Sequence, residues 1–124
     1  RLKSDLIDMI HACFSGGIDN YEIEWDERSA MGVVMSSKGY PESYETGKEI
    51  SGLDSLICKN DIKVFHSGTS LDSEKVLTNG GRVLCVTALG DDLIQSNERA
   101  YTAVKKLDWD GKYYRKDIGF RVMK

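Results

Sequence analysis

The segment from Val83 to Leu89 limits the possible folds of this chain more than any other feature. Nearly every position in it is apolar, several are β-branched, and Thr87 is the one residue that carries a hydroxyl group. A strand with apolar side chains on both faces belongs in the interior of a sheet. We therefore predict a central strand over residues 83–89.

The residues on either side of this segment predict how the chain enters and leaves the strand. Asn79-Gly80-Gly81 predicts a tight hairpin, because successive glycines suit a turn that needs positive φ, and Lys75–Thr78 would be the partner strand. After the strand, Gly90 breaks the pattern and Asp91-Asp92 suits the N-terminus of a helix. The apolar face of that helix is expected to pack on the sheet and comprises Leu93, Ile94, Asn97, Ala100, Tyr101, Val104 and Leu107.

The first part of the chain predicts a further helix. Apolar residues recur at helical spacing over residues 1–15, and Gly16-Gly17 suits a C-cap. The start of this helix is expected to lie before residue 1. Residues 19–27 alternate between apolar and acidic side chains, which is typical of a strand or of an extended loop.

Further strands are predicted in the middle of the chain. Ala30–Met35 reads as a buried strand, with Gly32 at a bulge or at a close approach of backbone. A turn is expected at Gly39–Glu42, and another strand at Ile62–His66. Hairpins or irregular segments join these strands, without regular crossover helices. The pattern favours an α+β fold with a mainly antiparallel sheet and flanking helices.

Composition excludes several classes of protein. With 124 residues, 40% of them hydrophobic and 30% charged, the chain can bury one core. A formal net charge of -3 argues against general nucleic-acid affinity, which requires a basic face. No apolar run approaches the roughly 18 residues that span a bilayer, and no signal peptide is evident. We expect a soluble, cytoplasmic protein.

The cysteines and histidines do not predict a metal site. Cys13, Cys58 and Cys85 are far apart and odd in number, so we expect reduced thiols, two of them in the core. His11 and His66 are the only histidines, and no close pair of ligands is present to start a zinc site.

Two polar regions could carry chemistry, although structural roles are favoured for both. The first is a loop with three carboxylates and two tyrosines that could serve acid and base catalysis or form a solvated loop: Tyr40, Glu42, Tyr44, Glu45 and Glu49. The second is His66, which could orient a substrate or cap the turn that follows it. The hydroxyls at Ser67, Thr69 and Ser70 have neither the order of a catalytic triad nor a nucleophile elbow.

The strongest candidate site is the basic segment near the end of the chain. Arg115, Lys116 and Arg121 lie beside Tyr113-Tyr114 in an otherwise acidic chain, and Asp117 lies among them. Arginine and lysine there could bind a phosphate, while Asp117 could hold an arginine or accept a hydrogen bond from a sugar hydroxyl. If the segment is a strand, Arg115, Asp117 and Arg121 share one side. An edge strand kept soluble by its charges is the equally weighted alternative.

Four segments of the chain resemble a known family of enzymes. In chain order they read WDERSAMGVVMSSKGYPESYETGKEI, VFHSGT, TNGGRVLCVTALGDDL and WDGKYYRKDIGFR. Together they resemble the C-terminal part of the phosphoribosylamine-glycine ligases, also called glycinamide ribonucleotide synthetases. The resemblance covers essentially the whole chain and keeps the family's order.

The resemblance implies an ATP-grasp ligase of de novo purine synthesis. Such a ligase joins glycine to 5-phosphoribosylamine through a glycyl phosphate, converts ATP to ADP and phosphate, and uses magnesium or manganese. The family's metal ligands belong to a segment upstream of Arg1, so this fragment is expected to bind neither ATP nor metal and to be inactive alone. Its function would be to complete the substrate cleft, with Arg115, Lys116, Asp117 and Arg121 as the residues that face it.

The resemblance also implies a division of the chain. Residues 1–18 would be a helix at the end of the ATP-grasp core, and residues 19–124 would be the C-terminal domain, of the rudimentary hybrid-motif type. The partners would be the N-terminal and ATP-grasp domains of the same polypeptide, without nucleic acid or membrane. A free-standing module that binds an anion or a phosphosugar is the alternative.

Overall fold

The computed structural model describes residues 1–57 and 59–123. Two α-helices and six strands follow one another as α1 (Leu6–Ser15), β1 (Ser29–Ser37), β2 (Ile62–His66), β3 (Thr69–Asp72), β4 (Lys75–Thr78), β5 (Arg82–Gly90), α2 (Leu93–Val104) and β6 (Lys112–Tyr114). Short 3-10 helices occur at Ile18–Asn20 and Leu53–Leu56.

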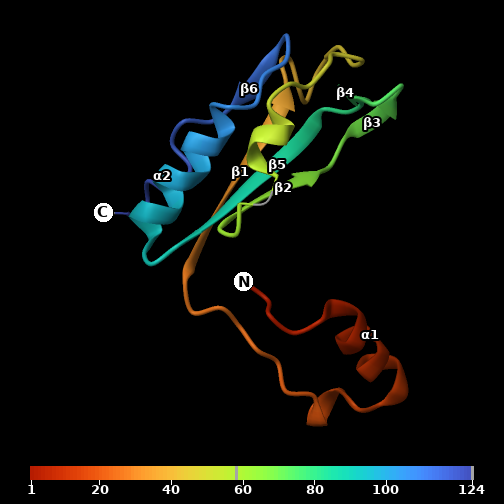
Figure 1. The fold of residues 1–124 in the computed structure, drawn as a ribbon, viewed down its shortest axis with the longest axis vertical. Coiled ribbons are helices and arrows are strands. Elements are labelled where there is room, and N and C mark those ends of the chain that lie inside the picture. The colour runs from red at the N-terminus through yellow and green to blue at the C-terminus, as the bar shows by residue number, and fades with distance from the viewer. Residues whose placement is uncertain (58, 124) are drawn as a thin grey trace.

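The main sheet has four antiparallel strands in the order β2-β5-β1-β6 (Figure 1). β5 lies between β2 and β1, as its apolar sequence requires of an interior strand. The predicted α+β class, the central strand and the strands that became β1 and β2 are therefore confirmed.

The predicted hairpin between β4 and β5 is wrong. β4 pairs instead with β3, in a separate two-stranded sheet whose turn uses Ser73 and Glu74 at φ 47° and 69°. The glycines between β4 and β5 do not have positive φ. They are needed because other atoms of the chain lie very close to their Cα atoms. A Cβ on Gly81 would collide with the Tyr40 ring, and one on Gly80 would lie 3.2 Å from the Cα of Gly68.

A bulge does interrupt the pairing of β1 with β5, but not at Gly32. Met35 pairs with Leu84 and Ser36 with Arg82, so Val83 is the extra residue on β5. At Gly32 a Cβ would make ordinary contacts of 3.5 Å with the side chains of Cys85 and Thr87. The close approach of backbone expected there is absent.

α2 covers one face of the sheet, and the hydrophobic core lies between them. Asp92 caps the helix, because its Oδ1 accepts a hydrogen bond of 2.7 Å from the Gln95 amide. The core contains side chains of β1, β5, α2, the segment after α2 and the connection between β1 and β2. Its buried residues are Met31, Val33, Met35, Ile50, Leu56, Val83, Leu84, Val86, Ala88, Ala100, Ala103, Val104, Leu107 and Trp109.

The buried face of α2 agrees largely with the predicted one, since Ala100, Val104 and Leu107 are buried and Leu93 and Tyr101 pack against the core, but it differs at three positions. Ser96 and Ala103 are buried, whereas Ile94 is 58% exposed. The backbone of Gly90 lies against Ser96 so closely that a Cβ on Gly90 would collide with the helix backbone. A small residue is therefore needed where α2 meets Gly90, and the pattern of large apolar residues did not predict Ser96 there.

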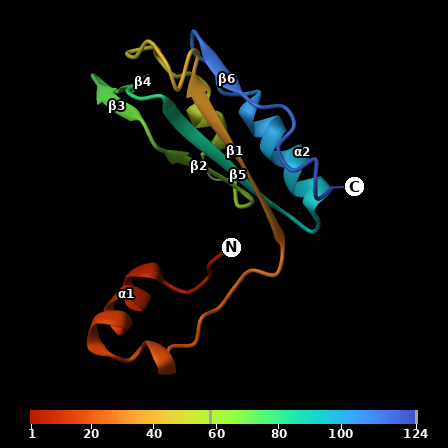
Figure 2. The same ribbon diagram turned by 180° about the vertical axis from the view of Figure 1, so that it is seen from behind.

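The N-terminal residues form an arm that lies apart from the sheet and α2 in both views (Figures 1 and 2). α1 begins at Leu6 rather than before residue 1, because Asp5 caps it by accepting a 2.7 Å hydrogen bond from the Ile7 amide. It ends as predicted at Gly16, with φ 72°. None of its residues is buried, and Leu2 bridges to Trp25 in the extended loop that returns to β1.

Two of the three cysteines lie within the described residues. Cys13 is exposed and therefore not a core residue, and Cys85 is half-buried; both are free thiols. Cys58 lies outside the described residues. No helix in the described part of the chain is long and apolar enough to cross a bilayer.

Candidate functional site

The basic C-terminal segment is held in place by α2. Tyr101 on the helix donates a 2.7 Å hydrogen bond to the Arg115 carbonyl and accepts one of 3.1 Å from the Ile118 amide. Asn97, also on α2, donates to the Ile118 carbonyl at 2.9 Å. These contacts fix the backbone of residues 115–118 without the aid of a strand.

The strand predicted across this segment is only partly present. β6 ends at Tyr114 as an edge strand beside β1, and residues 118–122 form turns. The alternation of side chains predicted from a continuous strand is therefore wrong beyond Tyr114. The pairing of β6 with β1 covers only Met35 to Ser37, although β1 itself extends back to Ser29.

Arg115 and Asp117 form a bidentate ion pair on the surface. Arg115 donates from Nε to Asp117 Oδ1 at 2.9 Å and from Nη2 to Oδ2 at 2.6 Å. The hydrogen bonds from Arg115 lower the pKa of Asp117, and the same contact raises the pKa of Arg115. Asp117 therefore orients the arginine, as one of the predicted roles requires, and neutralises part of its charge.

Lys116 points to a different place from Arg115. It lines a shallow groove of about 640 Å³ between α2 and β6, whose other lining residues are Asn97, Glu98, Tyr101, Thr102, Lys105 and Tyr114. Among the described residues, neither Lys116 nor Lys105 forms an ion pair with a carboxylate. Two lysines with free charge and two tyrosine rings make this groove suitable for a small anion.

Arg121 lies near this site but contacts a ring instead of the groove. Its guanidinium carbon is 5.7 Å from the centroid of the Phe120 ring, and its charge helps to lower the pKa of Asp117. The four predicted site residues thus share one surface segment. The structure places Lys116 in the groove and Arg115 with Asp117 beside it.

The contacts of the acidic loop, residues 40–49, favour a structural role for it over acid and base catalysis. Lys48 binds Glu45 at 2.7 Å and Asp110 at 3.4 Å, and these contacts raise the pKa of Lys48. Tyr40 and Tyr44 pack edge to face, with ring centroids 5.9 Å apart. Glu42 points to solvent.

The side chains of Glu49 and His66 also make structural contacts. Glu49 binds Lys75 at 2.8 Å on the surface. His66 Nδ1 lies 2.9 Å from the Thr69 hydroxyl, across the turn between β2 and β3. This is the capping arrangement predicted as one of the two roles of His66.

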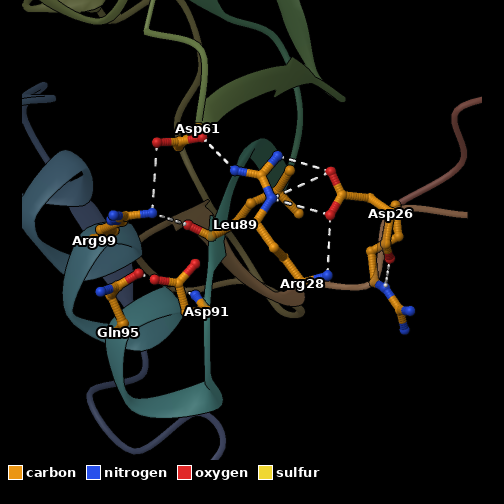
Figure 3. Close-up of polar contacts among 8 residues, drawn as sticks. Asp26, Arg28, Asp61, Leu89, Asp91, Gln95 and Arg99 are labelled. Atoms are coloured by element: carbon orange, nitrogen blue, oxygen red, sulfur yellow. Dashed lines mark hydrogen bonds and ion pairs between the residues drawn. The ribbon is translucent and has the colours of Figure 1, made fainter.

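A partly exposed ion network that the sequence did not reveal joins the arm to the body of the fold. Figure 3 shows Arg28 between Asp26 and Asp61, with Arg99 on the far side of Asp61. Arg28 donates to both oxygens of Asp26, at 3.0 and 2.7 Å, and to Asp61 at 2.7 Å. Arg99 lies 3.5 Å from the second oxygen of Asp61 and donates to the Leu89 carbonyl at 2.8 Å.

Only the local half of this network has a sequence signal. The spacing of Asp26 and Arg28 suggests a pair, whereas Asp61 is 33 residues further along the chain. The hydrogen bonds from Arg28 hold the pKa of Asp26 well below its usual range, and the two carboxylates raise the pKa of Arg28. The network is a structural element rather than a catalytic one, because every charge in it is compensated.

The described residues offer no metal centre. Nowhere between residues 1–57 and 59–123 do three histidine, cysteine, aspartate or glutamate side chains gather closely enough to hold a metal ion.

Comparisons with known proteins identify the chain's relatives. Residues 30–121 match the sequence profile described as "Phosphoribosylglycinamide synthetase, C domain". The chain is 50% identical over 124 residues to the phosphoribosylamine-glycine ligase of Salmonella typhimurium, covering 99% of this chain and 29% of that protein. The ligase of Allochromatium vinosum is 46% identical over 123 residues, which are 99% of this chain and 28% of that protein.

A solved structure gives the same result. The fold is similar to that of the phosphoribosylamine-glycine ligase of Thermotoga maritima with a TM-score of 0.68 and 29% identity, over 87% of this chain and 27% of that one. The chain thus spans less than a third of the length of the relatives it matches. Sequence profile, close relatives and fold agree: the chain belongs to the family of the phosphoribosylglycinamide synthetase C domain.

Proposed function

We propose that this chain is the C-terminal domain of an ATP-dependent ligase that joins glycine to 5-phosphoribosylamine, giving glycinamide ribonucleotide, ADP and phosphate. The observation that carries the proposal is the match of 99% of the chain, at 50% identity, to a phosphoribosylamine-glycine ligase. Residues 1–18, whose helix α1 has no buried residue, would belong to the end of the ATP-grasp core. Residues 19–124 would be the C-terminal domain, and the enzyme would act in the cytoplasm.

ATP and magnesium or manganese would be held by the rest of the polypeptide. We expect this domain to contribute no phosphoryl-transfer chemistry of its own. Its contribution would be to complete the cleft and to bind substrate. We therefore expect the isolated chain to be inactive.

Within the domain, the groove beside Lys116 is the proposed contact with the substrate's phosphate. Lys105 and Lys116 supply free positive charge there, and Arg115, held by Asp117, lies next to it. Arg121 would add to the local positive potential. A phosphorylated ribose presents the dianion that such a group of cations binds.

The activity is tested on the full-length polypeptide. Incubated with ATP, Mg²⁺, glycine and phosphoribosylamine, it should release ADP and glycinamide ribonucleotide in equal amounts, and omission of either co-substrate should stop both. ADP release that does not depend on glycine and phosphoribosylamine would contradict the proposal. Tight binding of ribose 5-phosphate by the isolated chain in calorimetry would instead support a free-standing module.

A further inference from the structure

The side chain of Arg28 provides a polar connection between the arm, residues 1–27, and the rest of the fold. Among the described residues, no ion pair and no backbone hydrogen bond joins the arm directly to residues 29–57 or 59–123. The arm also lies apart from the sheet and α2 in both views (Figures 1 and 2). The direction of the arm therefore depends on the short connection into β1 and on the contacts of Arg28.

On the arm side, Arg28 binds Asp26, which belongs to the base of the arm. The Asp26 amide donates a 2.7 Å hydrogen bond to the Arg1 carbonyl, and Arg1 Nε donates to the Asp26 carbonyl at 2.8 Å. The bridge between Leu2 and Trp25 continues this pairing of the two chain segments. A contact that holds Asp26 thus holds both segments from which the arm extends.

On the side of the sheet, Arg28 binds Asp61, which is tied to the end of β5 and to α2. The Asp61 carbonyl accepts a 2.8 Å hydrogen bond from the Leu89 amide, and its Oδ2 lies 3.5 Å from Arg99 Nη1. Arg99 also donates to the Leu89 carbonyl at 2.8 Å. The Asp61 carboxylate is therefore fixed relative to the sheet.

The guanidinium of Arg28 joins these two carboxylates (Figure 3). Nη2 donates to Asp26 and Nη1 to Asp61, each at 2.7 Å, and Nε adds a 3.0 Å bond to Asp26. The donors of a guanidinium lie in one plane at fixed directions, whereas a lysine ammonium has no such fork. The contact therefore defines an orientation between arm and sheet as well as a distance.

We infer that Arg28 is a positioning residue of the ligase, which holds this domain at the angle to the preceding core that brings the amine of phosphoribosylamine to glycyl phosphate. This inference rests on the proposed function, in which the arm continues from the ATP-grasp core and the groove beside Lys116 binds the substrate's phosphate. The amine nitrogen attacks the carbonyl carbon of glycyl phosphate, the bond from that carbon to the phosphate oxygen breaks, and the amine loses a proton. A displacement of about 1 Å lowers the rate of such a step by about 100-fold.

Water competes for glycyl phosphate when the amine is displaced. Attack of water on the same carbonyl carbon gives glycine and phosphate, so that ADP is released and no glycinamide ribonucleotide forms. The ratio of ADP to glycinamide ribonucleotide therefore measures the alignment of the amine. Loss of folded enzyme lowers both products equally and leaves this ratio unchanged.

Product ratios of the full-length polypeptide test the role of Arg28. Arg28→Gln should release at least about twice as much ADP as glycinamide ribonucleotide, where the unchanged polypeptide releases equal amounts. Asp61→Ala, which keeps the pair of Arg28 with Asp26, should also give an excess of ADP. The double variant should be no worse than Arg28→Gln, because both changes remove the same contact.

The matched control is Arg99→Gln, which removes a charge from the same network without removing a contact to the arm. Its two products should remain equal. Equal products from either Arg28→Gln or Asp61→Ala would overturn the inference, and so would an equal excess of ADP from Arg99→Gln.

Two further measurements keep the test decisive. If circular dichroism shows that Arg28→Gln does not fold, Asp61→Ala decides alone. An unchanged polypeptide that makes no glycinamide ribonucleotide contradicts the proposed function, whereas equal products from the unchanged polypeptide and from Arg28→Gln contradict only the role of Arg28. The two failures are therefore distinguishable.

Discussion

At the scale of single residues, Gly81 and Tyr40 show how a loop and a strand entry depend on one missing methyl group. The Tyr40 ring occupies the space that a Cβ on Gly81 would fill, and the Gly81 carbonyl accepts a 2.8 Å hydrogen bond from Ser37. The ring therefore closes the loop after β1 over the entry to β5. Gly80 and Gly81, which suggested a hairpin, therefore do not form one. Gly81 is needed to make room for the Tyr40 ring.

Gly81→Ala should lower the free energy of unfolding by about 1–3 kcal/mol, as overpacking in a close contact does. Denaturant titration of the chain measures it. In a Tyr40→Ala background the same change should be less than about 1 kcal/mol, because the collision is gone. Gly17→Ala, where a Cβ would have no contact below 3.7 Å, is the control. Equal effects of Gly81→Ala with and without the Tyr40 ring would exclude this role.

Acid pH should weaken the contact between Asp26 and Arg28. The pKa of Asp26 is lower in the folded chain than its ordinary value, chiefly through hydrogen bonds from Arg28, so the pair contributes stability above about pH 4. That contribution is lost as pH falls below pH 4 toward the folded pKa. Thermal unfolding should show a deficit for Arg28→Gln at neutral pH that shrinks on acidification.

The control for this titration is Lys75→Gln, which removes a single exposed pair with Glu49. Its effect should stay within about 0.5 kcal/mol at neutral pH. An Arg28→Gln deficit that grows as pH falls would have the wrong sign for an aspartate with a lowered pKa.

At the scale of elements, α2 shows what local sequence could and could not predict. Its start was predictable, because Gly90 and Asp92 are local signals for the end of a strand and a helix cap. Most of its buried face was predictable too, but the positions of Ser96, Ala103 and Ile94 were not. The distance between helix and sheet is set by the Gly90 backbone, so Ser96 is buried and Ile94 faces outward.

The same limit explains the other errors. β1, β2 and β5 are recognisable from their own residues, but the pairing of β4 with β3 depends on a turn at Ser73 and Glu74 that has no glycine. Asp61 lies close to Arg28 because β2 pairs with β5 in the assembled sheet. Partners distant in sequence are decided by the assembled sheet, not by local propensity.

Ser96→Leu tests the position of α2. The added side chain has no space against Gly90, so the free energy of unfolding should fall by about 1–3 kcal/mol or more. Ile94→Ala, on the exposed side, should change it by no more than about 0.5 kcal/mol in this chain. Denaturant titration compares the two variants. A larger loss of unfolding free energy for Ile94→Ala than for Ser96→Leu would show that Ile94 is buried, as periodicity predicted.

At the scale of the whole molecule, the candidate site was predictable as a segment but not as a geometry. Four residues of one motif were expected to face a cleft. The structure pairs Arg115 with Asp117, places Lys116 in a groove with Lys105 and leaves Arg121 on a phenylalanine ring. No sequence pattern indicated that Lys105 belongs to this site, because its place beside Lys116 depends on how α2 packs against β6.

In the proposed function, this domain supplies substrate-binding cations to the ligase. Steady-state kinetics of the full-length enzyme with Lys116→Ala tests it most directly, and Lys75→Ala, a surface lysine on β4, is the control. A hydrogen bond to a charged group contributes about 1.5–3 kcal/mol, so the KM for phosphoribosylamine should rise about 10-fold or more while the KM for ATP stays within about 2-fold. A Lys116→Ala enzyme with the wild-type KM for phosphoribosylamine would contradict the claim.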